Sequence, residues 1–218
     1  AEHLPNAVLG NVWGLTEATS IATYASGQEF SEHSRSVGRA VDGVEVRVWN
    51  EFDECFVDEP DAVGELCVRG PIVTAGYWGN PAATASTYRD GWLHTGDVGS
   101  IDAQGYVHVL DRSKDMIIRG GENVYSLEVE NAIAAHPDVA MVAVFGRPDD
   151  LFGERVCVAI VPEPGSRPTK ESLGSWAAQR LADYKVPVEW QFLDEMPLNA
   201  SGKVLKRQLS QTTPTGAP

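Results

Sequence analysis

The chain has 218 residues, of which 43% are hydrophobic and 22% are charged, and its formal net charge is −14. These values are typical of a globular protein. The negative charge argues against a nucleic-acid or anionic-membrane surface as the main partner, because phosphate groups bind clustered Lys and Arg. No apolar run approaches the ~20 residues that cross a bilayer, so no transmembrane segment is expected. Cys55, Cys67 and Cys157 lack metal-ligand spacing and indicate reduced thiols in a cytoplasmic protein.

The first predicted element is a short buried strand at residues 7–13, with the sequence AVLGNVW. A parallel strand needs neighbours and crossover connections, and almost nothing precedes this one. This stretch therefore indicates a fragment of something larger. The resemblance described below implies that residues 1–35 are the remnant of a large N-terminal α/β domain, whose missing portion is the expected partner. An apolar surface should then be exposed around residues 7–30, which favours association, for example as a homodimer.

Residues 36–110 have the pattern of a β structure. Strand patterns occur at residues 44–49 and 64–70, and at 98–111 as a hairpin. Asn80-Pro81 has the chemistry of a helix start and predicts a helix over about 81–88. Several short strands with regular turns indicate a barrel or a sandwich, and we expect a small, distorted β-barrel-like subdomain.

The charged stretch 111–115 is a predicted domain boundary, with an exposed turn as the simpler alternative, and the resemblance described below implies that it is a hinge. After it, residues 116–209 are expected to form a compact α+β domain. Its predicted strands are a short one at 116–118 and the three strands of a sheet at 139–146, 155–162 and 188–193. Two helices are expected, one capped by Ser126 with apolar positions Leu127, Val129, Ile133 and Ala134, and one from Thr169 to about Ala182. The polar tail 210–218 is expected to be disordered. The fold class is thus mixed α/β and α+β.

Two stretches of the first half carry polar side chains in settings that suit a ligand. In WGLTEATS, Thr16 and Glu17 follow a predicted strand; a hydroxyl can donate to a phosphate, and a carboxylate can hold Mg²⁺. The alternative is an ordinary helix start. In GWLHTGDVG, Asp97 lies in a Gly-rich turn, where one carboxylate can accept hydrogen bonds from both hydroxyls of a ribose. An Asx turn is the simpler alternative.

Two further stretches lie in the second half. RSKDMIIRGGEN offers Arg112, Lys114 and the pair Gly120-Gly121, which lets a ligand or another backbone come close, although a hairpin turn with solvated charges explains it equally. Lys203 follows a Ser-Gly turn, but the phosphate-loop pattern G-x-x-x-x-G-K-[ST] fails because Val204 replaces the final Ser or Thr. A solvent-facing lysine is the simplest alternative.

Five stretches of the chain resemble, in order and spacing, the second half of the adenylate-forming superfamily: WGLTE, GELCVRGPIVTAGYWGNPAAT, GWLHTGD, DRSKDMIIRGGENVYSLEVE and PLNASGKVLKR. The resemblance spans about residues 8–209. The superfamily includes acyl-CoA and aryl-CoA synthetases, non-ribosomal adenylation domains and beetle luciferases. Its members join a carboxylate to AMP from ATP, and a thiol then displaces the AMP.

The resemblance implies a nucleotide site in the first half of the chain. Trp13 looks like the aromatic residue that stacks on adenine. Thr16 is similar to the hydroxyl that contacts phosphate, and Glu17 to the carboxylate that coordinates Mg²⁺. Asp97 and Arg112 match the residues that bind the ribose.

The resemblance also implies roles for residues of the second half, in a domain that rotates between the two steps. Lys203 matches the lysine that reaches the carboxylate and the α-phosphate, where an ammonium stabilises the charge of the transition state. Lys114 falls on the hinge. Gly120 and Gly121 match the stretch that lines the pantetheine tunnel after the domain rotates. The implied substrates are ATP, coenzyme A and a small carboxylic acid.

The chain departs from the superfamily in two places. Ser126 stands where Pro is frequent, which should matter little because Ser caps a helix well. The superfamily's Ser/Thr/Gly-rich loop for the β- and γ-phosphates has no counterpart, so the chain alone is not expected to complete adenylation. Besides the acyl-CoA synthetase, two hypotheses remain: an adenylation domain that loads a carrier-protein thiol, and a truncated, non-catalytic module that binds or complements another polypeptide.

Overall fold

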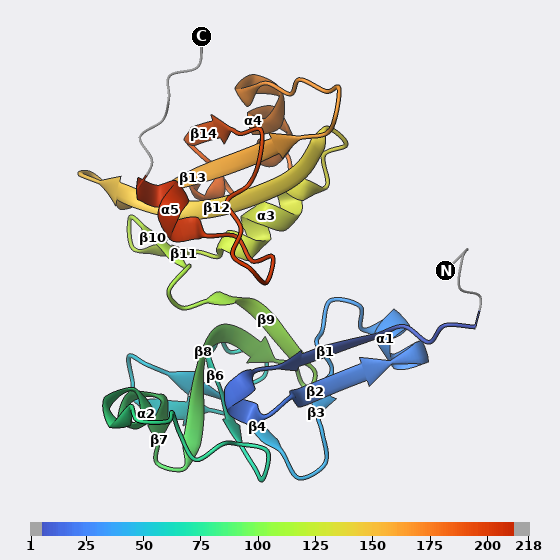
Figure 1. Ribbon diagram of the computed structural model, residues 1–218, viewed down its shortest axis with the longest axis vertical. Coiled ribbons are helices and arrows are strands. Elements are labelled where there is room, and N and C mark those ends of the chain that lie inside the picture. The colour runs from blue at the N-terminus through green and yellow to red at the C-terminus, as the bar shows by residue number, and fades with distance from the viewer. Residues whose placement is uncertain (1–5, 212–218) are drawn as a thin grey trace. The chain divides into compact units, whose positions relative to one another are not determined.

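The computed structural model describes residues 6–211 and divides the chain into two compact units, residues 1–113 and 114–218 (Figure 1). We call them the first and the second unit. Lys114, the predicted hinge, is the first residue of the second unit. Of the predicted tail, residues 210 and 211 belong to a helix, which corrects the expectation of disorder there, and residues 212–218 lie outside the described part. No helix of the described residues is long and apolar enough to cross a membrane.

The first unit begins with a three-stranded antiparallel sheet in the order β1-β2-β3. Its elements are β1 (Gly10–Gly14), the 3₁₀ helix η1 (Thr16–Ala18), β2 (Ile21–Ser26), α1 (Gly27–Glu32) and β3 (Arg39–Ala40). The prediction of a buried parallel strand at 7–13 is wrong: β1 starts later and turns back at once through η1, so it pairs with the next strand. The expected apolar exposure is present, since the paired residues Val12 and Tyr24 are 49% and 48% exposed.

A six-stranded antiparallel sheet makes up the rest of the first unit. Its order is β5-β4-β6-β8-β7, and β9 also pairs with β8. The elements are β4 (Glu45–Asn50), β5 (Cys55–Val57), β6 (Gly64–Arg69), α2 (Pro81–Thr87), β7 (Tyr88–Arg89), β8 (Trp92–Ile101) and β9 (Val107–Arg112). The helix at Pro81 is confirmed, with the Asn80 side chain accepting from the Ala83 N–H. No pairing among the described residues closes the sheet into a barrel.

The alternation of side chains explains how the two sheets of the first unit pack. Residues of one face of the large sheet form a core with residues of the small sheet: Trp13, Ala22, Val48, Leu66, Val68 and Leu93. Burial of such apolar side chains contributes about 25 cal/mol per Å² of apolar surface. The intervening residues, such as Glu65, Cys67 and His94, point to the opposite face because successive side chains in a strand alternate. The architecture is therefore nearer to a sandwich than to a barrel.

The second unit is built on a five-stranded sheet, which corrects the prediction of three strands. The strands are β10 (Ile117–Arg119), β11 (Glu122–Val124), β12 (Val139–Asp149), β13 (Gly153–Pro162) and β14 (Glu189–Phe192), of which only β14 pairs in parallel, with β13. The helices are α3 (Ser126–Ala134), α4 (Lys170–Ala178), η2 (Asp183–Lys185) and α5 (Lys206–Gln211). The additional strands form because Gly120 and Gly121, with φ of 61° and 87°, fold β10 back onto β11.

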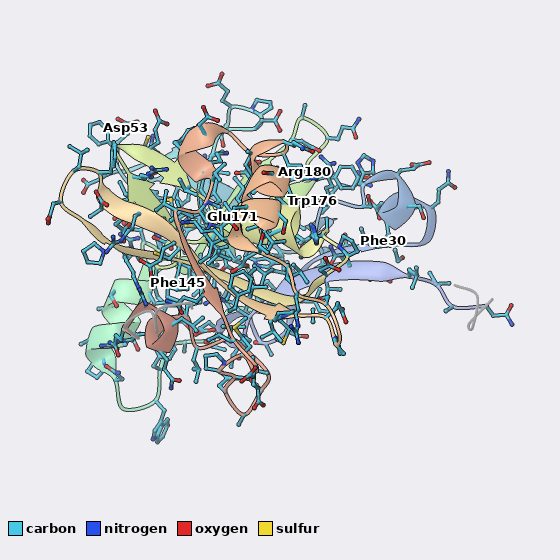
Figure 2. The ribbon with its side chains drawn as sticks, turned by 90° about the horizontal axis from the view of Figure 1, so that it is seen from above. Phe30, Asp53, Phe145, Glu171, Trp176 and Arg180 are labelled. Carbon is cyan, nitrogen blue, oxygen red and sulfur yellow. The ribbon has the colours of Figure 1, made fainter. Side chains whose placement is uncertain are left out.

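Both faces of this sheet are covered. Side chains of one face pack against α3 and α4: Val144, Val156, Val158 and Ile160 against Val129, Ile133 and Leu173. The opposite face carries Phe145, labelled in Figure 2, which packs in a cluster with Leu209 of α5. The period-two pattern of β12 and β13 thus directs neighbouring residues into two separate cores.

The starts and ends of the helices differ in part from the prediction. Ser126 is the first residue of α3 and not its cap, because Tyr125 takes the cap position. The Ser126 hydroxyl instead accepts from the Lys206 ammonium, at 2.7 Å. Of the four predicted apolar positions of α3, only Val129 and Ile133 are buried.

Thr169 caps α4 as predicted, in a reciprocal capping box with Ser172. The helix ends at Ala178, however, well before the expected Ala182. Leu181 lies beyond this end and packs into the core of the second unit, and no Gly or Pro marks where the helix stops.

Candidate functional site

Asp97 lies within the long strand β8 and not in a turn, which corrects the prediction for this residue. The strand is irregular there: Gly96 has a φ of 71°, and the register with β6 shifts between Glu65 and Cys67. The Asp97 side chain is buried. Its Oδ2 accepts from the Trp13 indole N–H at 2.8 Å, and its Oδ1 lies 2.7 Å from the Arg112 Nε.

Three further bonds fix the backbone around this carboxylate. The Thr95 hydroxyl donates to the Leu66 carbonyl at 2.6 Å and accepts from the Asp97 N–H at 3.0 Å. The Gly96 N–H donates to Glu65 Oε1 at 2.8 Å. These bonds fix the backbone that leads to Asp97, and Trp13 and Arg112 bind its side chain. The carboxylate is therefore held in place without a ligand. Thr95 and Glu65 could not be identified from the sequence, because no spacing in the chain links Glu65 to Gly96.

Thr16 and Glu17 form the start of η1, directly after β1. Thr16 is exposed, and Glu17 is half-buried. The Tyr77 hydroxyl donates to Glu17 Oε1 at 2.6 Å, and this bond raises the pKa of Tyr77 above its ordinary value. The Thr74 N–H also donates to the Glu17 carbonyl at 2.8 Å. The loop before α2 therefore orients Glu17, a role of Tyr77 that the sequence analysis missed.

Glu17 and Arg112 line one cavity of about 330 Å³, together with Tyr77, His94 and Thr95. A carboxylate, a guanidinium and a hydroxyl on one cavity can bind a polar, anionic ligand and a hard cation such as Mg²⁺. Asp97 does not line this cavity but contacts Arg112, which does.

Trp13 differs from what the resemblance implied. Its ring is only 8% exposed and belongs to the core of the first unit. In this structure its indole orients Asp97, and little of the ring face is open for stacking.

In the second unit, Gly120 and Gly121 form the hairpin turn between β10 and β11, the simpler of the two readings of this pair. The Gly120 N–H donates to the Phe152 carbonyl at 2.7 Å. A Cβ added to Gly121 would meet no atom within 4 Å, so its backbone is open to a ligand. Lys114 is exposed and borders a separate cavity of about 520 Å³ within the second unit.

Lys203 ends a tight turn on the surface of the second unit. The Asn199 side chain accepts from the N–H groups of Ser201 and Lys203, at 3.0 and 2.9 Å, and from the Ser201 hydroxyl at 2.8 Å. The Asn199 N–H donates to the Lys203 carbonyl at 2.8 Å. The Lys203 side chain is exposed, and within residues 6–211 its ammonium makes no hydrogen bond or ion pair. Its backbone is thus fixed while its charge is free.

The structure therefore brings the candidate residues together in part. Trp13, Asp97 and Arg112 form one connected cluster, and Glu17 shares a cavity with Arg112. Thr16 lies beside Glu17 in η1. The candidates of the second unit lie at separate places on it: Lys114, Gly120, Gly121 and Lys203.

Comparisons with known proteins match the two ends of the chain to two family models. Residues 1–78 match the family model described as AMP-binding enzyme, and residues 128–203 match the AMP-binding enzyme C-terminal domain. The chain is 43% identical over 197 residues to a feruloyl-CoA synthase of an Amycolatopsis species, covering 90% of this chain and 40% of that protein. It is 46% identical over 150 residues to the fatty acid–[acyl-carrier-protein] ligase ScoC of Streptomyces coeruleorubidus, covering 69% of this chain and 29% of that one.

Among solved structures, the fold is similar to the o-succinylbenzoate CoA synthetase MenE of Bacillus subtilis in complex with its acyl-adenylate intermediate. The TM-score is 0.88 at 33% identity, covering 95% of this chain and 42% of that one. A further structure of MenE, with a TM-score of 0.85 at 35% identity, contains ATP and a magnesium ion and covers 93% of this chain and 41% of that one. The chain thus spans about two fifths of the length of relatives such as the feruloyl-CoA synthase.

Proposed function

The chain belongs to the family of AMP-binding, adenylate-forming enzymes, and on this premise we propose that it is the C-terminal portion of an ATP-dependent, AMP-forming acid–CoA ligase. In the first step a carboxylic acid attacks the α-phosphate of ATP, giving an acyl-adenylate and pyrophosphate. In the second step the thiol of coenzyme A attacks the acyl carbon and AMP leaves. The names of the relatives differ in the acid, so the proposal extends to carboxylic acids as a class.

The observation that carries the proposal is the cluster of Trp13, Asp97 and Arg112. An ionised carboxylate has about four lone-pair positions, and Trp13 and Arg112 use two of those of Asp97. The remaining positions can accept from the two hydroxyls of a ribose. Because the cluster is already bonded, binding the nucleotide does not require the carboxylate to be ordered first, which preserves affinity.

Glu17 and Thr16 supply the groups for the phosphates. The Glu17 Oε1 accepts from Tyr77, and its carboxylate borders the cavity that Arg112 also lines. Hard oxygen ligands suit Mg²⁺, which when bound neutralises charge on the phosphates. The chemistry of Glu17 therefore fits the ion, and the exposed Thr16 hydroxyl can donate to a phosphate oxygen.

Lys203 supplies positive charge in the first step. Negative charge grows on the oxygens of the α-phosphate in the transition state, and a free ammonium stabilises it there. Its lack of a partner among residues 6–211 means that no ion pair has to break before it acts. For the second step, we assign Lys114 as the hinge and Gly120 and Gly121 as the open backbone along which the pantetheine chain lies.

The proposal is tested by fusing the N-terminal portion of a relative, such as the feruloyl-CoA synthase, ahead of this chain. AMP and acyl-CoA formation are measured with ATP, CoA and a panel of carboxylates. We expect turnover with at least one acid, and Lys203→Ala should lower ATP–pyrophosphate exchange by about 10²–10³-fold. Lys170→Ala, at an exposed lysine of the same unit, is the matched control. A folded fusion without turnover on any acid, or equal exchange in the two variants, would contradict the proposal.

A second candidate is transfer to the thiol of a carrier protein, which the similarity to the fatty acid–[acyl-carrier-protein] ligase ScoC favours. The first step and its residues are the same. The two functions are separated by offering the preformed acyl-adenylate to CoA and to a phosphopantetheinylated carrier protein. Faster AMP release with the carrier protein supports this second candidate, and faster release with CoA supports the first.

A further inference from the structure

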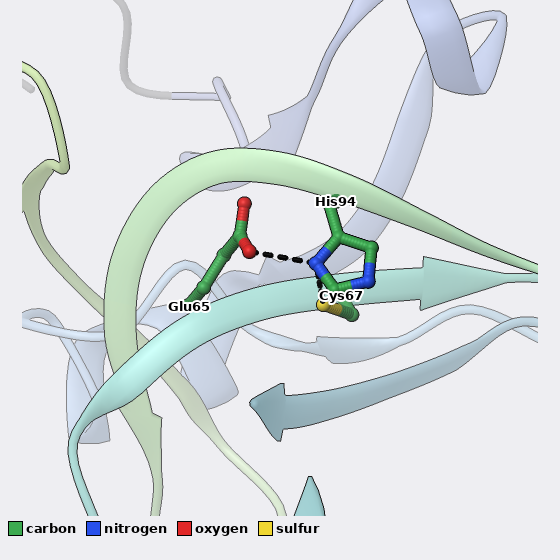
Figure 3. A group of neighbouring side chains, drawn as sticks. All are labelled: Glu65, Cys67 and His94. Atoms are coloured by element: carbon green, nitrogen blue, oxygen red, sulfur yellow. Dashed lines mark hydrogen bonds and ion pairs between the residues drawn. The ribbon is translucent and has the colours of Figure 1, made fainter. Parts of the chain in front are cut away.

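Three potential metal ligands meet on the face of the large sheet that points away from the core of the first unit (Figure 3). Glu65 and Cys67 are two residues apart on β6 and therefore share a face. His94 of β8 is the register partner of Cys67. Two paired strands thus present a carboxylate, a thiol and an imidazole. Glu65 Oε1 also accepts from the Gly96 N–H, and His94 borders the cavity that Glu17 and Arg112 line, but the proposed reaction uses no group of these three side chains chemically.

The distances between the ligand atoms suit one ion. His94 Nδ1 lies 3.4 Å from Cys67 Sγ and 2.7 Å from Glu65 Oε2, and the three atoms all lie within 4.8 Å of one another. In a tetrahedral zinc site, bonds of about 2.3 Å to sulfur and 2.0–2.1 Å to nitrogen place ligand atoms roughly 3.3–3.6 Å apart. The sulfur–nitrogen distance falls in this range. Only the carboxylate, at the end of the longest of the three side chains, has to move outward.

The hydrogen-bond geometry also indicates that a cation belongs here. The Arg89 Nη2 is 2.6 Å from the same His94 Nδ1 and 3.4 Å from Glu65 Oε2. One ring nitrogen has either a proton or a lone pair, so it cannot both donate to Glu65 and accept from Arg89. The contact with Arg89 requires a lone pair on Nδ1, whereas the contact with Glu65 requires a proton there, so the tautomer of His94 decides between them. In the tautomer with the lone pair, the imidazole, the carboxylate and the thiol form a ligand set for a positive charge, which the Arg89 guanidinium supplies in this structure.

Within residues 6–211, the Arg89 guanidinium has an unsatisfied nitrogen and a second carboxylate within reach. Its Nε is buried and has no hydrogen-bond partner among the described residues. A second carboxylate, that of Glu51, lies 3.6 Å from Nη2 and offers the guanidinium another place. Glu65, Arg89 and His94 also line the cavity of about 330 Å³, which gives an ion a route in and leaves room for a water as fourth ligand.

We propose that Glu65, Cys67 and His94 form a zinc-binding site, in which Zn²⁺ takes the place of the Arg89 guanidinium. The Cys67 thiol loses its proton to solvent and binds as thiolate, and no other bond forms or breaks outside the coordination sphere.

The site is tested on the chain as it stands, by titrating Zn²⁺ against a chromophoric chelator. We expect one ion per chain, a sulfur neighbour at about 2.3 Å in X-ray absorption, and an affinity at least about tenfold weaker in Cys67→Ser and His94→Gln. Cys55→Ser is the matched control, because Cys55 is exposed and lies on β5, which β4 separates from the β6 strand that carries Glu65 and Cys67. Circular dichroism without metal checks that each variant is folded. If one of the two variants is not folded, Glu65→Gln replaces it in the titration.

Arg89 provides an independent test. If its guanidinium and the ion share one position, Arg89→Gln should bind Zn²⁺ more tightly than the unmodified chain. The absence of stoichiometric binding in both proteins would overturn the proposal. So would binding that Cys67→Ser leaves unchanged, which would mark an adventitious ion at another group.

Discussion

The Asp97 cluster and the Lys203 turn hold their charged groups in opposite ways. Asp97 is buried, and both of its carboxylate oxygens have protein partners, Trp13 and Arg112. Lys203 has an exposed side chain without a partner among residues 6–211, but a backbone fixed by Asn199. In the Asp97 cluster the charged atoms themselves are ordered. In the Lys203 turn only the backbone that carries the charged side chain is ordered.

The difference matches what each group is proposed to do. A carboxylate that binds the unreactive ribose gains from being ordered in advance, because ordering costs affinity when it happens on binding. A lysine that acts in only one of two steps gains from a flexible stem and from having no ion pair to break. The anchoring of the Lys203 segment is instead found downstream, where Arg147 and Lys206 bind the elements around α5.

Arg147→Ala should have the largest effect, because it removes this anchor. The buried guanidinium pairs with Glu189 and donates to the carbonyls of Leu209 and Ser210 at the end of α5. Its loss leaves Glu189 with a weaker partner, and breaking such a buried pair costs about 3–5 kcal/mol. Urea denaturation followed by tryptophan fluorescence measures the change in the free energy of unfolding.

The matched control is Arg167→Ala, at an exposed arginine of the same unit, with an expected change within about 0.5 kcal/mol. If the two variants are equally stable, α5 is held by its apolar contacts alone, and the downstream anchoring of Lys203 is refuted.

Asp97→Ala should have an intermediate effect, about 1–3 kcal/mol, because the buried Trp13 indole N–H loses its acceptor. Arg112 is partly exposed, so water can replace its bond. Asp97→Asn keeps an acceptor for Trp13 and should lose less. Equal losses in thermal denaturation would show that the charge of Asp97, and not its bond to Trp13, stabilises the cluster.

The fold could be predicted where local chemistry decides it. Asn80-Pro81 and Thr169 start helices as expected, since capping depends on neighbouring residues. The strand at residues 7–13 was wrong because its pattern fits a buried parallel strand and an antiparallel edge hairpin equally well, and only the pairing partner distinguishes them. In the second unit the short strand at 116–118 was predicted, but β11 was not. β11 depends on the turn at Gly120 and Gly121, for which a hairpin was only one of two interpretations.

The candidate site could be predicted residue by residue from the resemblance, but its connections could not. Tyr77 reaches Glu17 across 60 positions of the chain, and Glu65 reaches Gly96 across 31. The potential zinc ligands could not be predicted for the same reason. Cys67 and His94 lie on neighbouring strands, so no ligand spacing in the sequence connects them. Contacts of this kind arise from strand register, which the sequence pattern alone does not specify.

Asn199→Ala should have the smallest effect on stability. It tests most directly whether Lys203 needs an ordered backbone. The side chain accepts three hydrogen bonds within the turn, but all are exposed, so the loss should be about 1 kcal/mol or less. Hydrogen exchange should quicken at residues 199–204 while α5 stays protected by Arg147, and ATP–pyrophosphate exchange in the fusion should fall. Ser201→Ala, which removes one of the three bonds, is the graded control. Unchanged nucleotide exchange in the presence of faster hydrogen exchange would mean that Lys203 acts without a fixed backbone, so that the turn would not be needed to position the charge.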